Sequence, residues 1–246
     1  MLEAFKNAPF LGRSITTTNL PNNFGRVLGF EQDKTKLVRV WGFPSTGSDV
    51  PDLQNSYTQD FQRWQKFTQQ SGIRIPNPMP VFGEGSIGSK TCMFYVVVEK
   101  VEGVNLHDYF FENKNEQDLV LINKFFGNLA DYAGLIYKRG GDFLSDQKLE
   151  QYVIGTTART QERDIYFVDL DREHGTYDIA DRKSSSNFRF FEFVGRICFM
   201  LQLLEAQCGG IKFEEAREKF IRFLNNIPDD DPHAKTKIGF RARLEK

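Results

Sequence analysis

The order of the predicted elements favours an α+β fold with two lobes. Strands dominate the first hundred residues and helices the rest, with one amphipathic helix between the early strands. The 246 residues suffice for one large domain or for two small lobes around a cleft. A hydrophobic content of 40% and a mean hydropathy of -0.46 are typical of a globular protein with a buried core.

The first half alternates strands with a single helix. Residues 24–43 predict a hairpin with a polar turn at 31–36, and the Pro-punctuated residues 72–85 predict extended chain. The continuous apolar run at 92–101 predicts a strand buried on both faces. Residues 51–71 predict a helix, because apolar residues recur there at spacings of three or four: Leu53, Tyr57, Phe61, Trp64 and Phe67. Gly72 fits the position just past its end.

The second half is mainly helical. Helices are expected over residues 118–138, 184–206 and roughly 213–225, and two short strands lie between the first and second of these. The 24 Phe residues, against 2 Trp and 8 Tyr, indicate a Phe-rich core. The tail from Pro228 turns from acidic to basic, which predicts either a solvated end or contact with an anionic surface such as a membrane leaflet.

Charge and cysteine usage limit the possible partners and compartment. With 32 basic and 33 acidic residues, the net charge of -1 gives no reason to expect nucleic acid. Cys92, Cys198 and Cys208 show no zinc spacing and suit a reducing compartment. No signal-type run begins the sequence and no apolar run approaches the roughly 18 residues of a membrane span, so we expect a cytoplasmic protein, with peripheral membrane contact through the basic tail as an alternative.

Two aspartates beside short predicted strands are the main candidates for residues of a functional site. Asp146 and Gln151 stand just ahead of one apolar strand in FLSDQKLEQYVI, and Asp169 ends another in IYFVDLDR. Phosphoryl transfer needs carboxylates that hold Mg²⁺ and an acid near the attacking hydroxyl. These side chains are candidates for both tasks, with residues 155–164 as the turn of a hairpin between them.

Other interpretations of these residues remain open. Asp146 and Asp169 each fit an ordinary turn residue that ends a strand. An alternative alignment uses Asp142 as the acid, but Lys148 and Leu149 then follow the metal position where an apolar strand is expected. The three histidines form no metal cluster or triad, and nothing supports a Cys–His nucleophile.

The sequence resembles the protein-kinase-like superfamily, with most similarity to the Kdo/heptose kinases of the lipopolysaccharide core. The motif FVDLDR fits their metal motif, DQKLEQYVI fits their catalytic loop, and QQSGIRIPNPMPVF resembles the end of their third helix. The resemblance covers roughly residues 24–204. It implies a bilobal protein-kinase-like fold, with a small β-rich N-lobe containing one helix (residues 1–100) and a larger, mostly helical C-lobe (residues 101–246).

The resemblance also implies a role for each motif residue. Asp146 would orient the acceptor hydroxyl, Asp169 and Gln151 would hold Mg²⁺, and FYVVVEKVEG would offer the backbone of Glu99 to Val101 to the adenine of ATP. Arg39, paired with Asp60, would hold the nucleotide phosphates, with Lys36 as a nearby substitute. The acceptor would be a sugar or glycolipid, or a protein.

Several departures from the family pattern favour a second hypothesis. Leu144 stands where such kinases carry His, no GxGxxG loop is present, and Arg39 replaces a lysine whose shape it does not share. These changes suit a pseudokinase that acts as a binding or scaffolding module. Retention of both Asp146 and Asp169 favours a working ATP-dependent transferase, and transfer of AMP in place of phosphate is a third possibility.

Overall fold

The computed structural model describes a mixed α/β protein that divides into two units. The described residues are 17–19, 27–30, 33–42, 50–87, 90–109, 115–169, 174–182 and 184–245. The first unit comprises Met1–Gln62, Pro76–Glu102 and Thr156–Glu162, and the second comprises Arg63–Ile75, Gly103–Gly155 and Arg163–Lys246. The functional division into a nucleotide-covering part and a catalytic part stays a prediction.

The first unit contains a five-stranded antiparallel sheet in the order β1-β2-β3-β5-β4. Its strands are β1 (Thr17–Asn19), β2 (Val27–Phe30), β3 (Lys36–Gly42), β4 (Pro78–Ile87) and β5 (Lys90–Glu99). The β2–β3 pair confirms the predicted hairpin. Val97 and Val98 are successive residues of β5 and both are buried, as expected for a strand covered on two faces.

Helix α2 (Val50–Ser71) confirms the helix predicted from the apolar stripe. In its last turns, Trp64 and Phe67 are buried one turn apart. The helix ends where Gly72 adopts φ = 70°, a left-handed conformation that glycine takes without the steric cost of a side chain.

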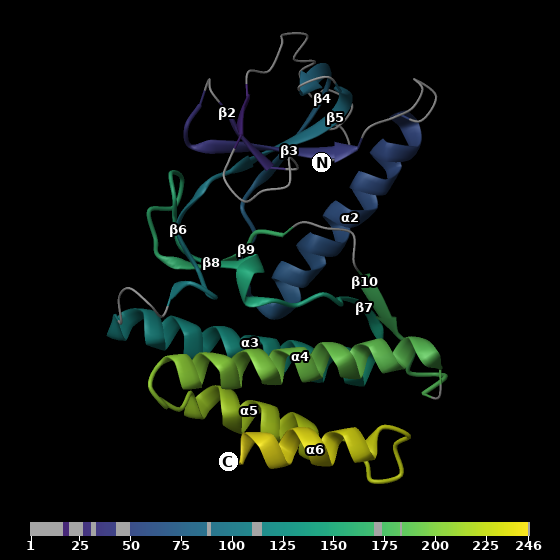
Figure 1. Cartoon of the computed structure of the whole chain (residues 1–246). Helices are drawn as coiled ribbons and strands as arrows, with labels where there is room; N and C mark the ends of the chain where they lie inside the picture. Colours follow the sequence, from purple (N-terminus) through teal and green to yellow (C-terminus); the bar gives the residue numbers. More distant parts are fainter. Residues whose placement is uncertain are drawn as a thin grey trace. The chain divides into compact units, whose positions relative to one another are not determined.

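Four helices make up most of the second unit: α3 (Glu116–Arg139), α4 (Ser185–Gln207), α5 (Glu214–Asn225) and α6 (Ala234–Leu244). Figure 1 shows α3 and α4 running side by side with α5 and α6 stacked below them. The helices predicted over 118–138, 184–206 and 213–225 are therefore confirmed. Within the described residues, none of the helices combines the length and apolar character that crossing a membrane requires.

Short strands precede and follow the predicted hairpin. β8 (Tyr152–Thr157) and β9 (Asp164–Phe167) pair antiparallel and confirm it, and β6 (Val101–Asn105) extends their sheet. β7 (Gly141–Leu144) pairs with β10 (His174–Tyr177), and neither strand was predicted from the sequence.

Aromatic side chains fill the core of the second unit, as the Phe-rich composition predicts. The ring of Phe190 lies within 4.6–6.5 Å of several others, namely Tyr137, Phe143, Tyr177, Phe191, Phe193 and Phe223. Cys198 is also buried, and burial raises the pKa of its thiol to about 12. It is therefore a core residue and not a reactive thiol.

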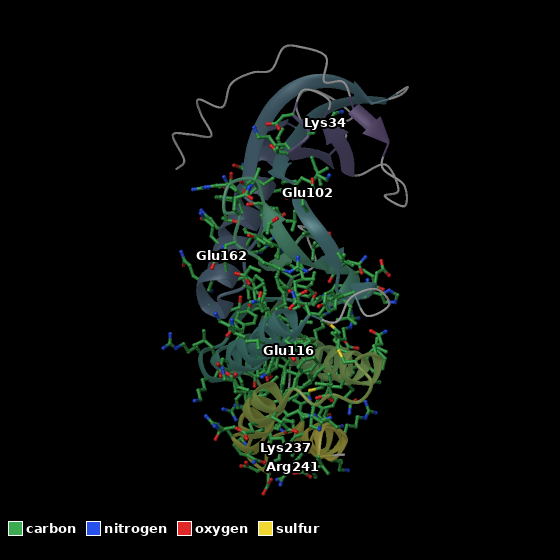
Figure 2. The ribbon with its side chains drawn as sticks, turned by 90° about the vertical axis from the view of Figure 1, so that its left-hand side faces the viewer. Lys34, Glu102, Glu116, Glu162, Lys237 and Arg241 are labelled. Atoms are coloured by element: carbon green, nitrogen blue, oxygen red, sulfur yellow. The ribbon has the colours of Figure 1, made fainter. Side chains whose placement is uncertain are left out.

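The C-terminal segment differs from the expected solvated end, because much of it forms helix α6 and packs on α4 and α5. The ring of Phe240 lies against Gly195, where an added Cβ would be 2.7 Å from it. Lys237 and Arg241 lie near each other on α6 (Figure 2), and both have internal partners. Lys237 donates to Ile227 O at 2.7 Å, and Arg241 pairs with Glu245 at 2.6 Å. Contact of the tail with an anionic surface stays a prediction.

Candidate functional site

The register of the β8–β9 hairpin brings together two of the predicted residues. Tyr152 of β8 pairs with Phe167 of β9, so the residue before β8 and the residue after β9 are adjacent. The backbone amide of Val168 accordingly donates to the carbonyl of Gln151 at 2.8 Å. Asp169 is the next residue, which places its carboxylate beside the Gln151 side chain.

The side chain of Gln151 joins the two predicted acids. Its Nε2 donates to Oδ2 of Asp169 at 2.9 Å and lies 3.4 Å from Oδ2 of Asp146. Its Oε1 accepts a hydrogen bond from the backbone amide of Lys148 at 2.9 Å. The structure therefore collects Asp146, Gln151 and Asp169 in one cluster, as the motif spacing predicts.

The loop that carries Asp146 is held by its neighbour Gln147. The Gln147 side chain is buried, donates to the carbonyl of Leu144 at 3.1 Å and accepts from the hydroxyl of Tyr152. Burial raises the pKa of Tyr152 well above its ordinary value, so the phenol stays protonated and keeps this donor. With Gln147 anchored inward, the adjacent Asp146 is left partly accessible, with 16% of its side chain exposed.

Two cations contact the carboxylate of Asp146. Lys148, in the same loop, lies 2.6 Å from Oδ2, and Arg196, on α4, contacts Oδ1. Helix α4 buries Phe193, Val194 and Ile197 and leaves Arg196 on its outer face, where 48% of the side chain is exposed. Each oxygen of Asp146 therefore has its own cationic partner.

The carboxylates of the cluster are of the kind that a phosphate-bound Mg²⁺ takes as protein ligands. Mg²⁺ keeps several waters and is usually bound by one or two carboxylates together with substrate phosphates. Asp169 is partly exposed and shares the Gln151 amide with the carboxylate of Asp146, and such a pair suits this pattern. Groups of three or more His, Cys, Asp or Glu side chains that could enclose a metal without phosphates do not occur among the described residues.

Gln151 has a different orientation from the one expected of a metal ligand. An amide binds a metal through its carbonyl oxygen, but in Gln151 that oxygen accepts from the Lys148 amide and the NH₂ group faces the carboxylates. Because only the oxygen can accept from a backbone N–H, this orientation is fixed by the network. In the arrangement described, Gln151 positions the two acids, and its role as a ligand stays a prediction.

The alternative acid, Asp142, lies in a separate set of contacts. It belongs to β7, accepts from Thr176 Oγ1 at 2.8 Å and lies 3.7 Å from Nε of Arg63. Asp146 shares the Gln151 amide with Asp169, and Asp142 does not. This geometry favours the alignment that uses Asp146. Residues 170–173, which complete the FVDLDR motif, lie outside the described residues.

All the residues expected to bind nucleotide belong to the first unit, and three of them lie in β3 and α2. Lys36 begins β3, and its Nζ lies 2.8 Å from Asp33 in the preceding turn. Arg39 is in β3 opposite Val27 and Val96, but its side chain is not among those described. Asp60 of α2 is buried and does not belong to a solvated helix face. The Arg39–Asp60 pair stays a prediction.

In the backbone segment expected to contact adenine, two amide groups already donate hydrogen bonds to neighbouring chain. The amide of Glu99 donates to Asn77 O at 3.3 Å, and that of Lys100 donates to Thr35 O at 2.8 Å. Val101 begins β6. β6 lies beside β8 in the three-stranded sheet, and the nucleotide contact of this segment stays a prediction.

Two members of the cluster were missed by sequence reasoning. Lys148 has a local signal, since it lies two residues after Asp146 in the same loop. Arg196 has none, because helical periodicity marks it only as an exposed position of α4.

Comparison with known proteins gives a distant structural likeness. No protein-family model matches the chain, and no curated protein matches it. The solved structure of WaaP in complex with acyl carrier protein matches 99% of this chain and 90% of that one, with 15% identity and a TM-score of 0.48. A TM-score below 0.5 does not establish a shared fold, and the complex with acyl carrier protein belongs to WaaP.

Proposed function

We propose that this protein is a kinase-like phosphotransferase that moves the γ-phosphoryl group of ATP to a hydroxyl acceptor. The observation that carries the proposal is the Gln151 amide that links the carboxylates of Asp146 and Asp169. Phosphoryl transfer depends on positioning and electrostatic stabilisation, and it uses one acid at the metal and another at the nucleophile. Because a scaffold has no need to assemble two such acids, the cluster favours catalysis over the pseudokinase alternative.

Each residue of the cluster has a defined task in this proposal. Asp169 would hold Mg²⁺, which neutralises charge on the phosphates when it is bound. Asp146 would accept a hydrogen bond from the acceptor hydroxyl and take its proton as the new P–O bond forms and the bond to ADP breaks. Gln151 would keep the two carboxylates apart and oriented. Nucleotide contacts through Arg39, Lys36, Asp60, Glu99 and Val101 belong to the same proposal.

The resemblance of the motifs supports a sugar or glycolipid acceptor, and a protein acceptor is the other candidate. Both present a hydroxyl to Asp146, so the cluster serves either chemistry. This choice rests on analogy between motifs, which is weaker than the geometric argument for the transfer itself.

A thermal shift with ATP, with and without Mg²⁺, tests the proposal. A ligand of the native state raises the melting temperature according to its concentration over its dissociation constant. We expect a Mg²⁺-dependent rise in the wild type and in Asp142→Asn, and a loss of that rise in Asp169→Asn. No rise in the wild type, or the same rise in all three proteins, would refute the proposed nucleotide site.

Transfer itself is tested with Asp146→Asn, which should lower the rate by about 10²–10⁴-fold, the range for loss of a general base. Mass spectrometry of the acceptor then distinguishes added phosphate from added AMP.

A further inference from the structure

Asp146 has one more cationic contact than its single charge requires. Lys148 lies at one carboxylate oxygen and Arg196 contacts the other, so the three side chains together carry an excess of one positive charge. Asp169, the other nearby acid, is the residue assigned to Mg²⁺ in the proposed function. With Asp169 counted, the described cluster contains two acids and two cations, so a preference for an anion must come from the remaining N–H donors of Arg196.

Arg196 is well suited to bind an additional anion. One of its terminal nitrogens, Nη1, contacts Asp146, whereas a guanidinium has five N–H donors in a planar fork. Its side chain is 48% exposed, compared with 16% for Asp146. A guanidinium of this kind binds the oxygens of phosphate or carboxylate in pairs, which a lysine ammonium does not.

The position of Arg196 restricts what it can recognise. An acceptor hydroxyl must come within hydrogen-bond distance of Asp146, so the groups next to that hydroxyl lie beside Arg196. An oxyanion at this position would pair with the remaining N–H donors of Arg196, and would be repelled less by Asp146 because that carboxylate is already paired twice.

We infer that Arg196 is a specificity-determining residue that binds an oxyanion, phosphate or carboxylate, carried by the acceptor close to the reacting hydroxyl. The inference rests on the proposed function for the identity of the acceptor. The oxyanion site itself is a property of Arg196 and can be measured without nucleotide.

The first experiment titrates inorganic phosphate into the nucleotide-free protein at constant ionic strength, without Mg²⁺, and follows the ³¹P line width. We expect saturable binding by the wild type that weakens at least about tenfold in Arg196→Gln, because a charge-assisted bidentate contact is lost. Arg196→Lys should give an intermediate loss. Arg189→Gln removes an exposed arginine two turns earlier on the same helix and should bind like the wild type.

Circular dichroism establishes whether each variant is folded, and Arg196→Lys carries the comparison if Arg196→Gln is not. Absence of phosphate binding by the wild type, or equal binding by wild type and both Arg196 variants, would overturn the inference.

The second experiment compares glycerol, glycerol 3-phosphate and glycerate as acceptors with Mg²⁺ and ATP. We expect the wild type to prefer an anionic acceptor at least about tenfold, and Arg196→Gln to lose the preference. Preference for glycerol 3-phosphate over glycerate, or the reverse, identifies the oxyanion. Transfer to all three at equal rates would overturn the inference and leave the proposed function standing. Phosphate binding that needs Arg196, without transfer or ATP-dependent stabilisation, would support the oxyanion site and refute the proposed function.

Discussion

The side-chain amide of Gln151 donates a hydrogen bond to Asp169 at 2.9 Å, although 18 residues separate the two in the sequence. The β8–β9 hairpin makes this contact possible, since its open end brings the residue before one strand next to the residues after the other. The same amide lies 3.4 Å from Asp146, so a single neutral side chain orients both acids.

Gln151→Ala tests this positioning role. The substitution leaves the backbone amide of Lys148 without its acceptor and frees both carboxylates, so the free energy of unfolding should fall by about 1–3 kcal/mol. Phosphoryl transfer should fall as well, while Gln117→Ala, at an exposed position in the first turn of α3, should change neither. Urea denaturation of the three proteins measures the difference. Equal midpoints for Gln151→Ala and wild type would show that the amide bridge does not organise the cluster.

Gly195→Leu tests how α6 is held on α4. Even a Cβ at position 195 would lie 2.7 Å from the ring of Phe240, so a leucine there must displace that ring or the helix that carries it. We expect a loss of about 1–3 kcal/mol of unfolding free energy, the usual cost of overpacking, and faster proteolysis near the C-terminus.

A second glycine provides the control for this prediction. Gly239 lies within α6, and a Cβ there would meet nothing within 4 Å. Gly239→Ala should therefore stabilise the protein by up to about 1 kcal/mol, because glycine costs more conformational entropy in a helix than alanine. Destabilisation of similar size by both variants would contradict the packing of α6 described above.

Alkaline pH should destabilise the fold. Burial raises the pKa of Tyr109 and of Tyr177 from 10.0 to about 12, and that of the Cys198 thiol from 9.0 to about 12. The unfolded chain releases these protons first and so binds fewer protons than the native state in this range. The contribution of these groups to the free energy of unfolding is then fully present below about pH 9. It is lost as the pH rises toward 12.

Urea midpoints between pH 8 and pH 11 measure this fall. Tyr177→Phe removes one of the titrating groups and should make the decline shallower, which separates the tyrosine effect from the loss of lysine charge in the same range. A wild-type midpoint that does not change over this range, or an identical slope in the variant, would refute the assignment.

Local patterns in the sequence were enough to predict most of the elements and the central acids. The apolar stripe from Leu53 to Phe67 predicted α2, because a helix must bury one face whatever it packs against. The spacing of Asp146, Gln151 and Asp169 predicted a cluster, because a hairpin between the last two returns the chain to its starting edge.

Contacts between distant segments could not be predicted in this way. The strand β7 has four residues and gains its structure by pairing with β10, where Gly175 lies opposite Phe143. The basic C-terminal segment was expected to be solvated or to contact an anionic surface, yet it forms α6, and the ring of Phe240 lies against Gly195 of α4.

The sequence by itself determined most of the strands and helices and the spacing that lets Asp146, Gln151 and Asp169 meet, because these depend on periodicity and on distance along the chain. Tertiary structure alone decided that Arg196 contacts Asp146 across 50 residues and that the Gln151 amide nitrogen faces the carboxylates. The first depends on which face of α4 packs into the core. The second depends on a backbone N–H at Lys148 that only the folded loop presents to the amide oxygen.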